Sequence, residues 1–213
     1  MNRSKIFAFA MAMAFGLAAP TGSLHAQDIT LPTPQKNASA GSLSKALQDR
    51  KSTRQFANTP LTDQQQADLL WAACGINRAD GRLTAPTARN LQDITVYVGR
   101  PDGTFRYDAK ANKLVKVGSG DLRLEAAKRN KFIASAPLVL VIASDTSVQG
   151  GRMDICGIDA GAVMQNVYLH CAASGLATVC CYAGEDTSAM QKFLGVKAEL
   201  KPLICMPVGL PQQ

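Results

Sequence analysis

Three short segments of the chain carry groups that could bind a phosphorylated aromatic ligand. Residues 50–54 (RKSTR) supply guanidinium, ammonium and hydroxyl groups, which suit the oxygens of a phosphate. Residues 86–92 (PTARNLQ) include Asn90 and Gln92, whose amides offer both a donor and an acceptor to the polar edge of a ring. Residues 175–184 combine glycines with main-chain N–H groups, so a flat ring could approach the backbone there.

Each segment alone also has an ordinary structural explanation. Arginines in a surface loop are usually just solvated, and an asparagine shortly after a proline is usually part of a turn. A glycine between a helix and a strand usually ends the helix. The three segments therefore indicate a binding site only when they are taken together and in their order along the chain.

Composition excludes several other functions. The 213 residues carry a net charge of +7, with 46% hydrophobic and 18% charged residues, a balance typical of globular proteins. The chain has two histidines, and His25 lies in a predicted leader, so a zinc site built on several histidines is excluded. The basic residues are scattered, which argues against nucleic acid as a partner.

The second histidine, His170, invites a catalytic interpretation because it adjoins Cys171. Both residues fall in a long predicted helix, where adjacent side chains do not face each other. A Cys–His pair is therefore not expected, and we predict that His170 is a core or interface residue.

Residues 1–26 have the layout of a secretory signal peptide. Arg3 and Lys5 precede an apolar run at 6–19, and Ala26 is a small residue at the expected cleavage site. The run is shorter than the ~20 residues of a membrane-spanning helix, so no stable membrane insertion is expected. Arg3 has no arginine beside it, which predicts export by the general route to the periplasm or the exterior.

The remaining residues read as an extended, mobile lead-in at 27–41 and one domain at 42–213. Periodicity and capping residues predict helices at 42–49, between Thr62 and Gly75, and at 121–130, 154–174 and 188–194. Alternating or continuous apolar runs predict strands at 94–98, 104–107, 113–117, 137–143, 176–181 and 203–208. This mixture indicates an α+β fold of two or three layers, with an antiparallel meander in its first half.

Six cysteines all lie beyond the predicted leader, an even number that permits disulfides in an exported protein. Fifteen pairings are possible, and the sequence does not choose among them. Cys180 and Cys181 are neighbours in a predicted strand, so they point to opposite faces and are not expected to pair. Because the domain is large enough to form its own core, we favour buried, unpaired cysteines over a disulfide framework.

In their order, the segments resemble the nitroreductase family of flavin-dependent oxidoreductases. An R-R-S-x-R-x-F motif after the first helix is matched by residues 50–56 (RKSTRQF), and a P-[ST]-x-x-N-x-Q motif by residues 86–92. The long helix with its Asp159-Ala160-Gly161 sequence, the Gly175-Leu176 entry to a strand and the closing residues 207–211 (PVGLP) are similar too. The resemblance covers about residues 43–211.

The resemblance implies a nitroreductase-like α+β fold, with a central mixed or antiparallel sheet flanked by helices, in a homodimer that binds FMN at its interface. It places Arg50, Lys51, Ser52 and Arg54 at the FMN phosphate or pyrimidine edge. It places Asn90 against the isoalloxazine ring, with Gln92 in the same motif. It gives Ala183 and Gly184 backbone contacts near the flavin N5 atom.

The implied activity is electron transfer through FMN to a small flat acceptor such as a nitroaromatic or a quinone. Two alternatives stay open: a flavin-binding or structural dimer with little turnover, and a binding module whose pocket holds no flavin. Relatives usually take electrons from NAD(P)H, a cytoplasmic pool. An exported member is therefore expected to use another donor, whose identity the sequence does not reveal.

Overall fold

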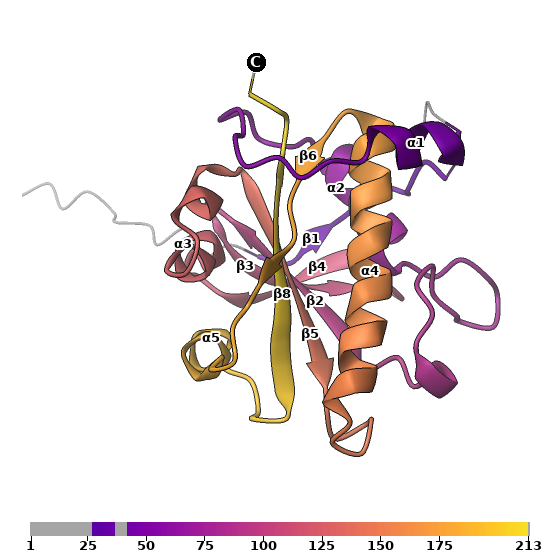
Figure 1. The fold of residues 1–213 in the computed structure, drawn as a ribbon, viewed down its shortest axis with the longest axis vertical. Coiled ribbons are helices and arrows are strands. Elements are labelled where there is room, and N and C mark those ends of the chain that lie inside the picture. Colours follow the sequence, from indigo (N-terminus) through magenta and orange to yellow (C-terminus); the bar gives the residue numbers. More distant parts are fainter. Residues whose placement is uncertain (1–26, 37–41, 213) are drawn as a thin grey trace, which may run out of the picture.

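The computed structural model describes residues 27–36 and 42–212, and its elements are labelled in Figure 1. The predicted signal peptide at 1–26 lies outside the described residues, as does the end of the lead-in at 37–41.

Within residues 27–36 and 42–212, eight strands form one sheet in the order β1-β4-β3-β2-β5-β8-β6, and β7 also pairs with β8. The strands are β1 (Ile29–Thr30), β2 (Ile94–Arg100), β3 (Gly103–Asp108), β4 (Lys113–Gly118), β5 (Leu138–Asp145), β6 (Ala177–Thr178), β7 (Cys181–Tyr182) and β8 (Leu200–Gly209). Every pairing among them is antiparallel, which narrows the expected mixed or antiparallel sheet to an antiparallel one.

β5 lies in the middle of the sheet, between β2 and β8, and its apolar residues are buried on both faces. Side chains alternate along a strand, so Leu138, Leu140 and Ile142 join one core while Val139 and Val141 join the other. The continuous apolar run at 137–143 in the sequence therefore corresponds to a strand that is covered on both faces.

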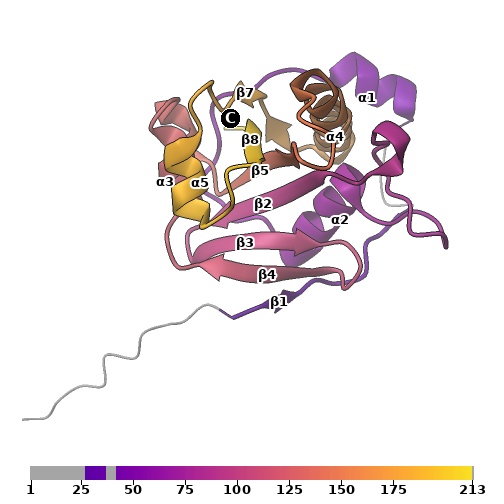
Figure 2. The same cartoon turned by 90° about the horizontal axis from the view of Figure 1, so that it is seen from below.

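Five α-helices and two 3₁₀ turns cover the sheet in the described part of the chain. They are α1 (Leu43–Asp49), α2 (Asp63–Cys74), α3 (Leu122–Ala127), α4 (Met153–Ser174) and α5 (Ser188–Leu194), with η1 (Ala88–Asn90) and η2 (Lys131–Ser135). α2 and α4 contribute to the core on one face of the sheet, and α3 and α5 to the core on the other (Figure 2). The result is the three-layer α+β arrangement expected from the sequence.

The predicted ends of α2 and α4 are confirmed. Thr62 and Gln65 form a reciprocal capping box at the start of α2. Gly175 follows α4 with a φ of 72°, in the left-handed region that glycine enters without a steric penalty.

Three predicted elements differ in the structure. The strand expected at 176–181 is divided into β6 and β7, because the N–H of Cys180 donates to the Tyr168 hydroxyl at 2.7 Å instead of joining the ladder. The helix expected at 121–130 ends at Ala127 and gives way to η2. Part of the lead-in expected to be mobile is a strand, because β1 pairs with β4 and the adjoining Leu31 is buried in the core.

All six cysteines are free thiols; five are buried and Cys180 is half-buried. The prediction of buried, unpaired cysteines is thus confirmed. Among the described helices, none combines the length and the apolar character that a membrane span requires.

Candidate active site

The 50–54 segment and the 175–184 segment lie side by side, although more than a hundred residues separate them in sequence. The chain leaves α1 at Arg50 and runs across β6, where the N–H of Thr53 donates to the carbonyl of Thr178 at 2.9 Å. Farther on, Phe56 forms an isolated bridge with Pro211, next to the end of β8. Two of the three segments predicted from the sequence therefore meet.

Tyr168 of α4 connects these two segments, and the sequence analysis did not single it out. Its hydroxyl lies 2.9 Å from the Ser52 hydroxyl and accepts the N–H of Cys180 at 2.7 Å. The guanidinium of Arg50 stacks over its ring at 5.2 Å from the centroid. A tyrosine among the buried, mainly apolar positions of the long helix is the signal that could have identified it, since a buried hydroxyl needs a polar partner.

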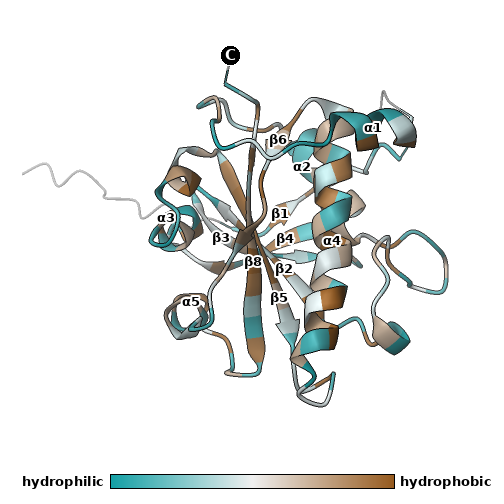
Figure 3. Ribbon diagram, viewed as in Figure 1, coloured by the Kyte–Doolittle hydropathy of each residue, from teal (hydrophilic) through white to brown (hydrophobic). Residues whose placement is uncertain are grey.

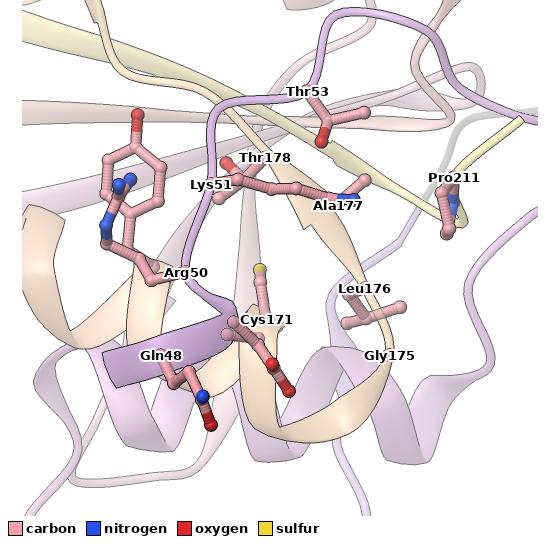
Figure 4. Close-up of a pocket in the computed structure, with 13 residues that line it drawn as sticks. Gln48, Arg50, Lys51, Thr53, Cys171, Gly175, Leu176, Ala177, Thr178 and Pro211 are labelled. Carbon is pink, nitrogen blue, oxygen red and sulfur yellow. The ribbon is translucent and has the colours of Figure 1, made fainter. Parts of the chain in front are cut away.

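A cavity of about 450 Å³ opens where the segments meet (Figure 4). Its lining includes Arg50, Lys51, Thr53, the 175–178 turn and Pro211. The Lys51 side chain extends across the cavity towards Ala177 and Pro211, as Figure 4 shows. Cations, hydroxyl groups and a glycine-containing turn thus surround one hollow large enough for a small ligand.

The cations of residues 50–54 form no ion pair with the part of the chain that the structure describes. Within the described residues, Arg50, Lys51 and Arg54 have no carboxylate oxygen within the 4.0 Å that defines an ion pair. Asp49 also lines the cavity, but its carboxylate pairs with Lys45. A concentration of positive charge without counter-charge is the electrostatic environment that a phosphate requires.

Ala183 and Gly184 follow β7, and Ala183 lines a second cavity, of about 290 Å³, whose lining also includes residues of α3 and α5. The N–H of Ala183 donates to the carbonyl of Leu203 at 3.0 Å, so this group is already used in the sheet. Gly184 has a φ of 112°, and a Cβ there would come within 2.5 Å of the Arg129 guanidinium. The N–H of Ala183 is therefore not available for one of the two predicted backbone contacts.

The 86–92 segment lies apart from the other two. It flanks η1 on one side of α4, and residues 50–56 lie on the opposite side in both Figure 1 and Figure 2. Asn90 and Gln92 are exposed, and the Gln92 amide donates to the Asn90 side-chain oxygen at 3.4 Å and to the Gly81 carbonyl at 3.1 Å. One chain thus does not bring Asn90 and Gln92 to the Arg50 cavity.

The backbone of this segment is strained. Arg89, Asn90 and Gln92 have φ values of 55°, 55° and 49°, in the left-handed region that side chains with a Cβ rarely occupy. Such conformations persist only where the surroundings hold them, and they concentrate at functional sites.

A buried polar network underlies the segment. The N–H of Ala88 donates to both carboxylate oxygens of Asp159 at 3.0 Å. The Gln149 amide donates to Asp159 and to Asp93, also at 3.0 Å each, and the Ser144 hydroxyl donates to Asp93. Burial and the adjacent Asp93 raise the pKa of the Asp159 carboxyl above its ordinary value, against the opposing effect of the Ala88 N–H.

His170 takes no part in either group of segments. It lines a hollow beside Trp71 and Ser174, and burial lowers the pKa of its imidazole while the charge of Asp68 opposes this. Its half-buried position on α4 is consistent with the predicted core or interface role.

Comparisons with known proteins agree with this architecture. The family model described as "Nitroreductase family" matches residues 47–210. A provisionally named nitroreductase from Methanocaldococcus jannaschii is 33% identical over 181 residues, which cover 78% of this chain and 90% of the relative. A crystal structure of a provisionally named nitroreductase from Ralstonia eutropha has a TM-score of 0.81 at 31% identity, covering 88% of this chain and 91% of that one.

A more distant structure shares the fold alone. The NADPH:FMN oxidoreductase of Vibrio harveyi, solved with NAD⁺, has a TM-score of 0.58 at 20% identity, covering 80% of this chain and 69% of that one. The sheet, its helical layers and the matching family model define an oxidoreductase. The chain belongs to the nitroreductase family.

Proposed function

We propose that this protein is an FMN-dependent oxidoreductase that transfers electrons to a small flat acceptor such as a nitroaromatic or a quinone. The cation cluster at the Arg50 cavity is the observation that carries the proposal, because its charge is uncompensated within the described residues. The Vibrio harveyi structure and an FMN-dependent nitroreductase from Clostridium difficile support the choice of FMN, as proteins of the same fold whose names include it.

The residues present fit FMN in charge and in space. Arg50, Lys51 and Ser52 would hold the phosphate, with the Ser52 hydroxyl fixed by Tyr168. The Gly184 backbone and the exposed Arg54 would lie towards the ring. When bound, FMN would supply the redox chemistry, and the protein's part is to bind it, orient it and stabilise negative charge on the reduced ring with these cations.

A homodimer would bring the third segment to the same flavin. Asn90 and Gln92 lie across α4 from the Arg50 cavity, so we propose that each flavin is completed by the 86–92 segment of a second copy. Helices α1 and α4 carry exposed apolar side chains. Ile158 is 67% exposed, and Leu43, Leu47 and Met153 are between 48% and 66% exposed. Figure 3 shows apolar residues among the polar ones along α4, and the exposed Met153 and Ile158 on this helix suit an interface.

Replacing Ile158 by aspartate tests this interface. In a two-fold interface the substitution places one aspartate on each subunit, and each carboxylate would face either apolar surface or the other aspartate. Both arrangements are unfavourable, so the variant is expected to elute as a monomer and to lose FMN. Analytical ultracentrifugation with FMN titration is the measurement. Val148→Asp is the control, because Val148 is an exposed apolar residue outside α1 and α4. A dimeric I158D that retains FMN would contradict the proposed interface.

We also propose that the protein is exported and acts outside the cytoplasm. The proposal rests on the leader-like residues 1–26 alone. In the periplasm or outside the cell, NAD(P)H is not expected as the donor, and a membrane quinol or another redox protein would replace it. Finding the full-length product uncleaved in the cytoplasm would remove the reason to seek another donor.

The direct test of the proposed function is the visible spectrum of the purified protein, before and after addition of FMN. We expect flavin absorbance that stays with the protein through gel filtration. After anaerobic reduction, a nitroaromatic or a quinone should reoxidise the bound flavin faster than oxygen does. The matched control is Arg78→Ala, which removes an exposed arginine outside both cavities.

The alternatives give different outcomes in the same experiment. A protein that retains flavin but is not reoxidised by either acceptor would be the flavin-binding dimer with little turnover. A protein that binds no flavin at any concentration would be a binding module, and the proposed activity would be wrong.

A further inference from the structure

The strained 86–92 segment has one buried attachment to the long helix. Ala88 precedes the three left-handed residues, and its N–H points into the protein, where Asp159 accepts it with both oxygens at 3.0 Å. Asp159 is only 4% exposed. Asn90, in contrast, is exposed on the other side of the segment.

The carboxylates beneath the segment are fully hydrogen-bonded, and no cation pairs with them among the residues that the structure describes. All four carboxylate oxygens of Asp93 and Asp159 accept a hydrogen bond, from Ala88, Gln149 or Ser144. Within the described part of the chain, neither carboxylate has a lysine, arginine or histidine partner. Two buried negative charges without a cation are costly, and burial together with the neighbouring Asp93 raises the pKa of the Asp159 carboxyl.

We propose that Asp159 is a positioning residue, which holds the N–H of Ala88 and so fixes the strained 86–92 segment in the conformation that lets Asn90 and Gln92 face the flavin. The proposal rests on the proposed FMN function for its last step. The hold on the segment itself rests only on the contacts of this chain. Asp159 is not expected to touch the flavin, because it is buried beneath the segment.

The first test compares Asp159→Ala with Asp159→Asn in the flavin-free protein. Alanine removes the acceptor of the Ala88 N–H, so hydrogen-exchange protection of residues 86–92 should fall by about tenfold. Asparagine keeps one acceptor oxygen and offers an amide donor to Asp93, so protection should stay within about threefold of the wild-type value. Asp154→Ala is the matched control, an exposed acid of the same helix that pairs with Arg152.

The second readout is the dissociation constant for FMN, measured by flavin fluorescence on the same proteins. We expect the same order, with Asp159→Ala weakened by about tenfold and Asp159→Asn close to wild type. Unchanged protection in Asp159→Ala would overturn the proposal, and so would damage by asparagine equal to that by alanine. Lost protection with no FMN binding by the wild-type protein would instead overturn the proposed function and support the hold on the segment.

The third readout is the pH dependence of the free energy of unfolding. A contact that involves no titrating group would not make this dependence differ between the wild-type protein and Asp159→Asn. The Asp159 carboxyl has a raised pKa in the folded protein, so its protonated form is favoured there. Wild-type stability should therefore fall relative to Asp159→Asn as pH rises above the ordinary aspartate value of 3.8 and through the raised pKa. Parallel pH profiles of the two proteins would show that Asp159 is not buried beneath the segment and would overturn the proposal.

Other titratable and charged groups near the buried network are the same in the wild-type protein and in Asp159→Asn. Asp93 and Cys156 are the titratable groups that act on or beside Asp159, and burial raises the pKa of the Cys156 thiol. Arg89 is exposed on the segment itself. Asp145, at the end of β5, pairs with Lys197. Because all of these are identical in wild type and Asp159→Asn, the difference between the two profiles isolates Asp159. Should Asp159→Ala fail to fold, this comparison still decides the proposal.

Discussion

Replacing Arg50 by alanine is expected to raise the dissociation constant for FMN by about ten- to a hundredfold, the effect of losing a charge-assisted hydrogen bond of about 1.5–3 kcal/mol. Arg50 lines the cavity, is half-buried and has no carboxylate partner among the described residues. Its positive charge is therefore available to a ligand. Fluorescence titration of the flavin-free protein with FMN measures the effect.

The controls separate binding from folding. Arg50 also stacks on Tyr168, an interaction worth about 0.5–1 kcal/mol at an exposed site, so a small loss of stability is expected as well. Arg50→Lys keeps the charge but not the two-pronged geometry, and should fall between wild type and alanine. Arg78→Ala should bind FMN as the wild type does. If Arg50→Ala binds FMN with unchanged affinity, Arg50 does not belong to the site.

The sequence was informative where structure is decided locally. The capping box at Thr62 and the glycine after α4 depend on residues within one turn, and both were predicted correctly. The apolar run of β5 was likewise identified as a strand buried on both faces, because no exposed face interrupts it.

Elements whose bounds depend on contacts with distant residues could not be predicted from the sequence. The division of the predicted 176–181 strand follows from a hydrogen bond to Tyr168, on another element. The pairing of residues 29–30 with β4 joins segments more than eighty residues apart. The types of neighbouring residues do not determine which distant segments pair with each other.

The site was predictable in composition but not in arrangement. The first motif identified a set of residues of which Arg50, Lys51 and Thr53 line one cavity together with the 175–178 turn. It gave no indication that α4 separates them from Asn90, nor that the Ala183 N–H is used by Leu203. The 86–92 segment is proposed to contribute to a second subunit's site because of its position in the structure, and its residue types alone do not indicate this.

Tyr168→Phe is expected to lower the free energy of unfolding by about 1–3 kcal/mol, a large effect for the loss of one oxygen atom. The hydroxyl is the acceptor of the Cys180 N–H, which has left the sheet ladder and has no other backbone partner among the described residues. Phenylalanine fills the same space but leaves this donor unsatisfied. Urea denaturation, with the slope of the transition compared between the proteins, measures the change.

The same variant tests whether the hydroxyl also organises the cavity. Without it Ser52 loses its partner and the turn before β7 is released, so FMN should bind about tenfold more weakly. Tyr182→Phe is the control, because Tyr182 is 57% exposed and its loss should change stability by less than about 0.5 kcal/mol. Reduced stability with unchanged FMN affinity would limit Tyr168 to a structural role. Unchanged stability would contradict the hydrogen bond itself, since a buried acceptor cannot be removed without cost when its donor stays behind.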